Sequence, residues 1–194
     1  MAAVRARRAM SLFEHLPHPY ARIRLRRLRA SDFRAFHAYR SDPDVARYQG
    51  WSVMSEDEAY AFLRDQARNA GLEHGEWAQL GIAAIEDDQL LGDIGVWLAP
   101  DGRWAEFGLS VHPQYQRAGF GRESAEALIA LLFAHTPAQR VVAATDARNT
   151  ACLRMLEGLG MRLADTAEAE YKDEQCIEHV YAIERGSAMP PAVS

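Results

Sequence analysis

The residues best suited to chemistry lie in one stretch, 106–123, which reads EFGLSVHPQYQRAGFGRE. It predicts a strand, a loop that holds Gly119 and Gly121, and the start of a helix. Glycine lets a ligand approach the main chain, and the free amides of a first helical turn carry a partial positive charge. This turn is therefore suited to a diphosphate, to which Arg117 and Arg122 could add charge-assisted hydrogen bonds.

Two common phosphate-binding motifs do not fit this loop. The dinucleotide fingerprint G-x-G-x-x-G follows the first strand of its domain, whereas these glycines come late and have the spacing Gln116-x-x-Gly119-x-Gly121. A Walker loop needs Gly-Lys-Ser/Thr, and the stretch contains no lysine. Two glycines also suit a plain turn into a helix, so the loop alone does not define a function.

The surrounding sequence predicts the elements that must position the loop. Alternation around Ile23 and Leu25 indicates a half-buried strand, and Ser55 with Glu58 forms a capping box that opens a helix ending near Gly71. Further strands are expected at 77–86, 90–98, 104–111, 140–145 and 177–183, and further helices at 31–40, 119–135 and 149–159.

The order of these elements indicates the fold class. Three successive strands in the middle of the chain exclude a regular alternating fold. We expect one α/β (α+β) domain with a mixed sheet of about six or seven strands, antiparallel in its first half, and about four helices on its two faces.

The composition suits a folded protein of ordinary size. The chain has 194 residues, of which 48% are hydrophobic and 25% charged, and no run approaches the ~18 apolar residues of a membrane span. Cys152 and Cys176 are too few for a disulfide framework and lack metal-ligand spacing, so we expect no metal and a reducing, cytoplasmic location. The formal net charge of -5 disfavours nucleic-acid binding.

The charge is uneven near the N-terminus. Residues 1–29 hold eight arginines and one acid, Glu14. We expect an arginine-rich leader over 1–18, a folded domain over 19–185 and a short tail over 186–194. The leader suits a solvated segment, an organelle address or an arm for an acidic partner such as RNA.

Several pieces of the chain, in the same order, resemble the GNAT acyltransferase superfamily, and most closely the subfamily that contains the ribosomal-protein N-terminal acetyltransferases. They are the loop motif of the form Q/R-x-x-G-x-G/A at Gln116–Gly121, the strand before it at 105–116, the helix at 149–161 and two opening segments at 28–32 and 42–48. The resemblance covers about residues 20–184 and implies an N-acetyltransferase that uses acetyl-CoA.

The resemblance also assigns roles to residues of this chain. In the family, main-chain amides of the glycine loop bind the diphosphate of acetyl-CoA, and the pantetheine arm lies where the preceding strand diverges from the next. The implied contacts are Leu109, Ser110 and Val111 in the strand, Gln116, Arg117, Ala118, Gly119, Phe120, Gly121 and Arg122 in the loop, and Asn149 at the later helix. Asparagine is also a good N-cap, and both roles can hold together.

Acetyl transfer needs a base for the amine, and Glu106 is our candidate. It shares a strand face with Gly108 and Ser110, and family members often carry a carboxylate there, although a solvent-facing glutamate is the alternative. Many members have a tyrosine acid seven residues after the asparagine, where this chain has Leu156. Cys152 could donate the proton instead, with a thiol pKa lowered by the helix start, or it could pack as a small hydrophobe.

Two aromatic side chains, Trp51 and Tyr48, lie between predicted helices and could line an acceptor pocket. We therefore expect transfer of an acetyl group from acetyl-CoA to a primary amine, of a protein N-terminus or a small molecule, by direct attack in a ternary complex. The alternative is a non-catalytic acyl-CoA-binding module that acts as a sensor or scaffold. The sequence predicts no membrane partner and leaves open the acceptor, the length of the acyl group and a homodimer.

Overall fold

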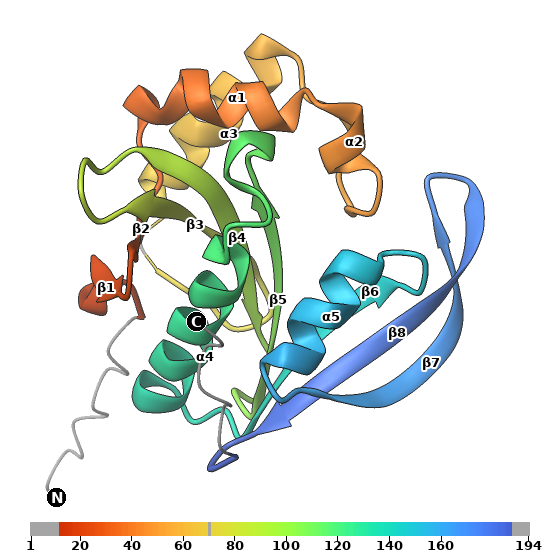
Figure 1. Ribbon diagram of the computed structural model, residues 1–194. Coiled ribbons are helices and arrows are strands. Elements are labelled where there is room, and N and C mark those ends of the chain that lie inside the picture. The colour runs from red at the N-terminus through yellow and green to blue at the C-terminus, as the bar shows by residue number, and fades with distance from the viewer. Residues whose placement is uncertain (1–11, 70, 188–194) are drawn as a thin grey trace, which may run out of the picture.

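The described part of the chain, residues 12–69 and 71–187, folds around a sheet of eight strands in the computed structural model (Figure 1). The strands are β1 (His18–Tyr20), β2 (Ile23–Arg27), β3 (Trp77–Ala84), β4 (Leu90–Leu98), β5 (Trp104–Val111), β6 (Arg140–Asp146), β7 (Arg162–Tyr171) and β8 (Glu174–Glu184). Their order is β1-β2-β3-β4-β5-β6-β8-β7, and every neighbouring pair is antiparallel except β5 and β6. The predicted mixed sheet with an antiparallel first half is therefore confirmed.

Helices cover both faces of this sheet. They are α1 (Phe33–Arg40), α2 (Pro43–Ala46), α3 (Glu56–Arg68), α4 (Phe120–His135) and α5 (Thr150–Gly158), with short 3-10 turns η1 (Leu12–His15), η2 (Ala30–Asp32) and η3 (Pro113–Tyr115). α1 and α3 pack with Leu28 and Leu90 into a small core, whereas α4 packs into the larger core on the other face. No helix in the described ranges is long and apolar enough to cross a membrane.

Two strands were not predicted. β1 is only three residues long, and nearly every residue of β7 is exposed, so no apolar alternation reveals it in the sequence. Main-chain pairing with β8 at the sheet edge stabilises β7 instead. The sheet therefore has eight strands in the described ranges, rather than the expected six or seven.

β5 and β6 diverge partway along their length. Their parallel pairing joins Trp104 to Arg140, Ala105 to Val141 and Glu106 to Val142, and it ends there, although both strands continue. The second half of β5 therefore keeps β4 as its neighbour and opens a gap on the side of β6.

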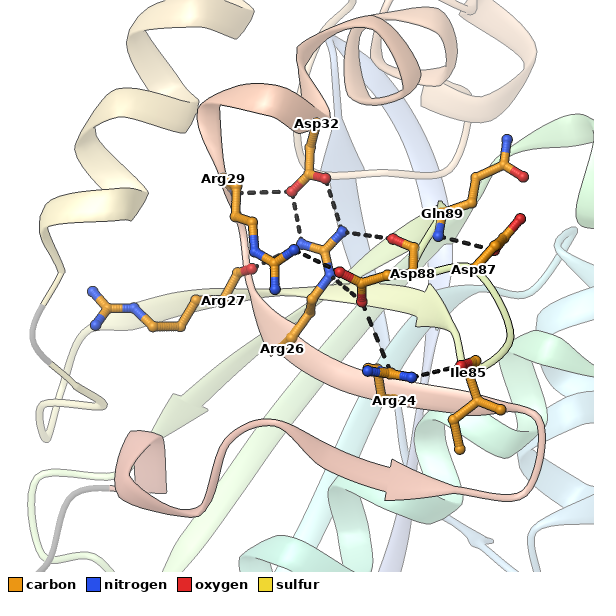
Figure 2. Close-up of polar contacts among 9 residues, drawn as sticks. All are labelled: Arg24, Arg26, Arg27, Arg29, Asp32, Ile85, Asp87, Asp88 and Gln89. Carbon is orange, nitrogen blue, oxygen red and sulfur yellow. Dashed lines mark hydrogen bonds and ion pairs between the residues drawn. The ribbon is translucent and has the colours of Figure 1, made fainter.

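The arginines of β2 and the turn after it tie parts of the fold together, as Figure 2 shows. Arg26 is buried and makes two bonds of 2.8 Å to the carboxylate of Asp32 in η2. Asp88, in the turn between β3 and β4, accepts from Arg26 at 3.1 Å and from Arg29 at 2.5 Å. Arg26 and Arg29 therefore each have a carboxylate partner within the fold, which joins β2 to the turn between β3 and β4.

Residues 12–18, which the sequence placed in the leader, pack with the domain. Leu12 and Phe13 belong to the main core, and His18 begins β1. Burial of these apolar side chains explains why the packed region extends further toward the N-terminus than predicted. The rest of the predicted leader, and residues 188–194 of the predicted tail, lie outside the described residues.

Candidate active site

The glycine loop, residues 116–122, joins β5 and η3 to α4. Arg117 and Gly119 both have left-handed backbone angles, with φ of 60° and 87°, and Gly119 forms the N-cap of α4. The N–H of Glu123 donates to the carbonyl of Gly119 at 3.1 Å. The main-chain N–H groups of the residues just before Glu123 have no carbonyl of a preceding helical turn to bond to. These amides lie at the positive end of the α4 dipole in an exposed loop, which fits a diphosphate group.

Gln116 does not act as predicted within this loop. Its main-chain N–H donates to the carbonyl of Pro113 at 3.2 Å and closes the η3 turn. Its side-chain amide donates to the carbonyl of Val111 at 2.9 Å and ties the loop to the end of β5. Gln116 therefore holds the loop in place, and its amide is not directed at a ligand.

The two arginines of the loop differ in their surroundings. Arg122 donates to Glu126 at 2.8 Å one turn further along α4, which neutralises part of its charge. Arg117 is exposed at the left-handed position of the loop. Their contacts with a diphosphate stay predictions.

Arg22, which the sequence did not single out, anchors the glycine loop from 96 residues away. Its guanidinium donates to the carbonyl of Ala118 at 2.7 Å and to the carboxylate of Glu123 at 2.7 Å, and its main-chain N–H donates to Glu123 at 3.1 Å. It also lies 4.5 Å from the ring centre of Phe120. Arg22 thus fixes both ends of the turn, and no local pattern in the sequence could have indicated this.

The gap beside β5 presents main-chain donors. The N–H of His112 donates to Leu91 of β4 at 2.8 Å, so alternation along the strand turns the N–H groups of Val111 and Leu109 away from β4. The carbonyl of Leu109 accepts from the side chain of Gln49 at 3.1 Å. Ser110 was predicted as a third main-chain contact, but the same alternation turns its main chain toward β4.

Glu106 lies where the two strands part, with Gly108 and Ser110 on the same face of β5. This face lines the β5 cavity, which has a volume of about 990 Å³. Burial raises the pKa of the Glu106 carboxyl, and the charge of Glu178 raises it further. Trp51 and Tyr48 also line this cavity, so the structure brings both predicted acceptor residues to the predicted base.

Two long-range contacts build the wall of the β5 cavity. Arg40 of α1 forms a buried ion pair with Asp93 of β4, and its guanidinium lies 4.2 Å from the ring centre of Trp51. On the other side, Lys172 at the tip of the β7–β8 hairpin donates to the carbonyl of Ala46 in α2. The tip of the hairpin therefore contacts α2, and Figure 1 shows the hairpin curving away from the rest of the sheet.

Cys152 and Asn149 lie at the start of α5. The side chain of Asn149 accepts from the N–H of Cys152 at 3.2 Å, which is the N-cap geometry. Burial raises the pKa of the Cys152 thiol, and this outweighs a bond with Thr145 that acts in the opposite direction. The predicted lowering of this pKa is therefore wrong, because the side chain packs against the core near the helix start. Cys152 does not line the β5 cavity.

Comparison with known proteins defines the class of this protein. The chain matches the acetyltransferase (GNAT) domain family over residues 22–162 and belongs to that family. It is an N-acetyltransferase, as the sequence predicted. It is 27% identical over 141 residues to the uncharacterised N-acetyltransferase YnaD of Bacillus subtilis (strain 168), a match that covers 73% of this chain and 79% of that protein.

Solved structures show the same fold. A GNAT-family acetyltransferase from Bacillus anthracis has a TM-score of 0.76 and 26% identity, and the match covers 86% of this chain and 96% of that one. RimL, a ribosomal alpha-N-protein acetyltransferase solved in complex with coenzyme A, has a TM-score of 0.73 and 16% identity, with 86% and 97% covered. The predicted fold family is therefore confirmed.

Proposed function

We propose that this N-acetyltransferase binds acetyl-CoA along β5 and transfers the acetyl group directly to a primary amine held in the β5 cavity. The observation that supports this most is the divergence of β5 from β6 directly after Glu106. It leaves main-chain donors of Leu109 and Val111 on one side of the gap, with the glycine loop at its end. CoA binding is named for RimL, a structural neighbour.

The residues of the glycine loop suit the diphosphate of the cofactor. The amides from Ala118 to Arg122 lie at the start of α4, and Arg22 holds the turn that presents them. Asn149 caps α5 on the far side of the gap and can bind the pantetheine arm without losing its cap.

Bound acetyl-CoA supplies an acetyl group activated as a thioester. Glu106 accepts the proton that the amine must lose before its nitrogen bonds to the acetyl carbon. An N–H of Leu109 or Val111 donates to the acetyl oxygen as negative charge develops on it. The carbon–sulfur bond breaks and its electron pair leaves with the sulfur. Because its pKa is raised, the Cys152 thiol is protonated at neutral pH and can donate a proton to that sulfur, after which solvent reprotonates Cys152 and takes the proton held by Glu106.

Calorimetric titration with coenzyme A and acetyl-CoA tests the first half of this proposal, and amine-dependent thiol release tests the second. We expect micromolar binding and release that depends on the amine. Binding without release for any primary amine would favour the sensor or scaffold alternative, and no binding would overturn the proposal. Cys152→Ala tests the proton donor, since an unchanged rate would mean that the thiolate leaves unassisted.

A further inference from the structure

A second carboxylate faces the β5 cavity. Glu178 of β8 lines it together with Val180, two residues further along the same strand face. The hydroxyl of Tyr171, on β7, donates to the Glu178 carboxylate and fixes its position. Glu106 lines the cavity from β5, so two carboxylates from different strands share it.

The negative charge of Glu178 acts on Glu106. Burial raises the pKa of Glu178, as it does that of Glu106, so both carboxyl groups lack full hydration. Three cationic side chains also line the cavity. Arg40 forms an ion pair with Asp93, Arg140 lies 3.6 Å from Glu184, and Arg103 precedes β5 on an exposed turn. No arginine in the described ranges is among the causes that shift the pKa of Glu106 or Glu178. A cation placed between the two carboxylates would therefore relieve their mutual repulsion.

An aromatic wall continues the same face of the sheet. Trp77, Trp97 and Glu106 stand in one row across β3, β4 and β5, because Trp97 is the register partner of both other residues. Trp77 and Trp104 line the cavity and remain 51% and 37% exposed, which is unusual for side chains of this size. Aromatic walls of this kind bind flat apolar groups.

Two glycines form part of the floor of the cavity, one covered by Gln79 and Trp77 and one open. Gly95 and Gly108 are register partners on β4 and β5, next to the row that holds Glu106. A side-chain atom added at Gly108 would meet nothing within 4 Å, so this part of the floor is hollow. A flat body can therefore lie over the sheet between the tryptophans and the two carboxylates.

We propose that the acceptor is a primary amine on a flat aromatic body, an arylalkylamine, without a carboxylate on the carbon that bears the amine, and that Glu178 determines this specificity. This inference rests on the proposed function. The ammonium lies between Glu106 and Glu178, and the ring lies against Trp77 and Trp104. A carboxylate beside the amine would lie close to two negative side chains, which would repel it.

Matched acceptors test the inference directly. Tryptamine and tryptophan differ only in the carboxylate, and we expect kcat/KM for tryptamine to be higher by about 100-fold or more. Hexylamine keeps the amine on an apolar chain without a ring, and we expect it to be about tenfold poorer than tryptamine. Equal use of tryptophan, or better use of a peptide with a free N-terminus, would overturn the inference and leave the acetyltransferase activity intact.

The variant Glu178→Gln separates specificity from chemistry. We expect it to raise KM for tryptamine by about tenfold and to change kcat by less than about threefold, with the affinity for coenzyme A unchanged. Glu178→Asp should recover part of the loss, and Tyr171→Phe should cause a smaller rise in KM. A variant with unchanged KM for tryptamine would contradict the role of Glu178.

Binding to the coenzyme A complex keeps the two proposals apart. Calorimetry should show tryptamine binding well above tryptophan, and Glu178→Gln should reduce that difference. Selective binding without thiol release would overturn the proposed function and support the specificity. Equal binding of both compounds, or binding of neither, would overturn the specificity whatever the turnover.

Discussion

The glycine loop and the β5 cavity lie along the same strand, yet they are built in different ways. The loop is one short run of chain, and backbone angles at Arg117 and Gly119 aim its amides. Arg22 supports it from far away in the sequence. The cavity is instead lined by residues of α1, α3, the loop before α3, and strands β3 to β8.

The two regions therefore depend to different degrees on the side chains around them. Main-chain donors bind a diphosphate whatever side chains surround them, so the loop needs little beyond its glycines. The cavity depends on where each side chain is held. The Trp51 ring packs on Arg40, which is itself held by its ion pair with Asp93. The Glu178 carboxylate is held by the hydrogen bond from the Tyr171 hydroxyl.

The largest expected effect separates chemistry in the cavity from binding at the loop. Glu106→Gln keeps the shape of the side chain and removes the base, so kcat should fall by about 10²- to 10⁴-fold. The affinity for coenzyme A should not change, because Glu106 lies apart from the loop. Steady-state thiol release and calorimetry measure the two quantities. A kcat within threefold of the unchanged enzyme would remove Glu106 from the mechanism.

A matched pair of glycine variants tests the two regions against each other. Gly119→Val places a branched side chain at φ of 87°, with strain of about 1–2 kcal/mol, and should weaken coenzyme A binding about 5- to 30-fold. Gly108→Val places the same side chain in open space on a strand, and should lower kcat/KM for the amine about tenfold at unchanged coenzyme A affinity.

Gly186→Val is the control for backbone strain in this pair. Its φ is 86°, nothing lies within 4 Å of an added side-chain atom, and it is remote from the loop in the sequence. We expect a small loss of thermal stability and unchanged coenzyme A binding. If Gly108→Val weakened coenzyme A binding as much as Gly119→Val, the two regions would not be separate.

A smaller effect is expected at the long-range support of the loop. Arg22→Met removes the bonds to Ala118 and Glu123 and keeps much of the apolar side chain. Since the arginine is half-exposed, we expect coenzyme A affinity to fall only about three- to tenfold. The KM for the amine should not change. An unchanged affinity for coenzyme A would mean that the loop holds its own shape.

The smallest expected effect concerns pH. Because the pKa of Glu106 is raised above its ordinary value of 4.5, the base form is lost at a higher pH than for an exposed glutamate. The rate should rise with pH through that raised pKa. Removing the nearby charge with Glu178→Gln should move the acid limb of kcat to lower pH. If the acid limb of the kcat–pH profile shifted to higher pH or did not shift, the coupling of these two carboxyl groups would be contradicted.

Local patterns predicted much of this fold. The capping box of Ser55 and Glu58 forms as expected, with Glu58 accepting from the N–H of Ser55 at 2.8 Å. The three central strands and the long helix after the glycines also lie where periodicity placed them. Exposed β7 escaped prediction, because only its partner strand defines it.

What the sequence determined alone is the set of features that depend on neighbouring residues: the strands, the helix starts, the turn at Gly119 and the family motif it carries. What only the tertiary structure decided is which distant side chains meet. Arg22 joins Glu123 across 101 residues, and Glu178 comes to face Glu106 through the sheet order β5-β6-β8. A local pattern reports the conformation of nearby backbone, whereas a cavity depends on contacts that form only when the whole chain packs.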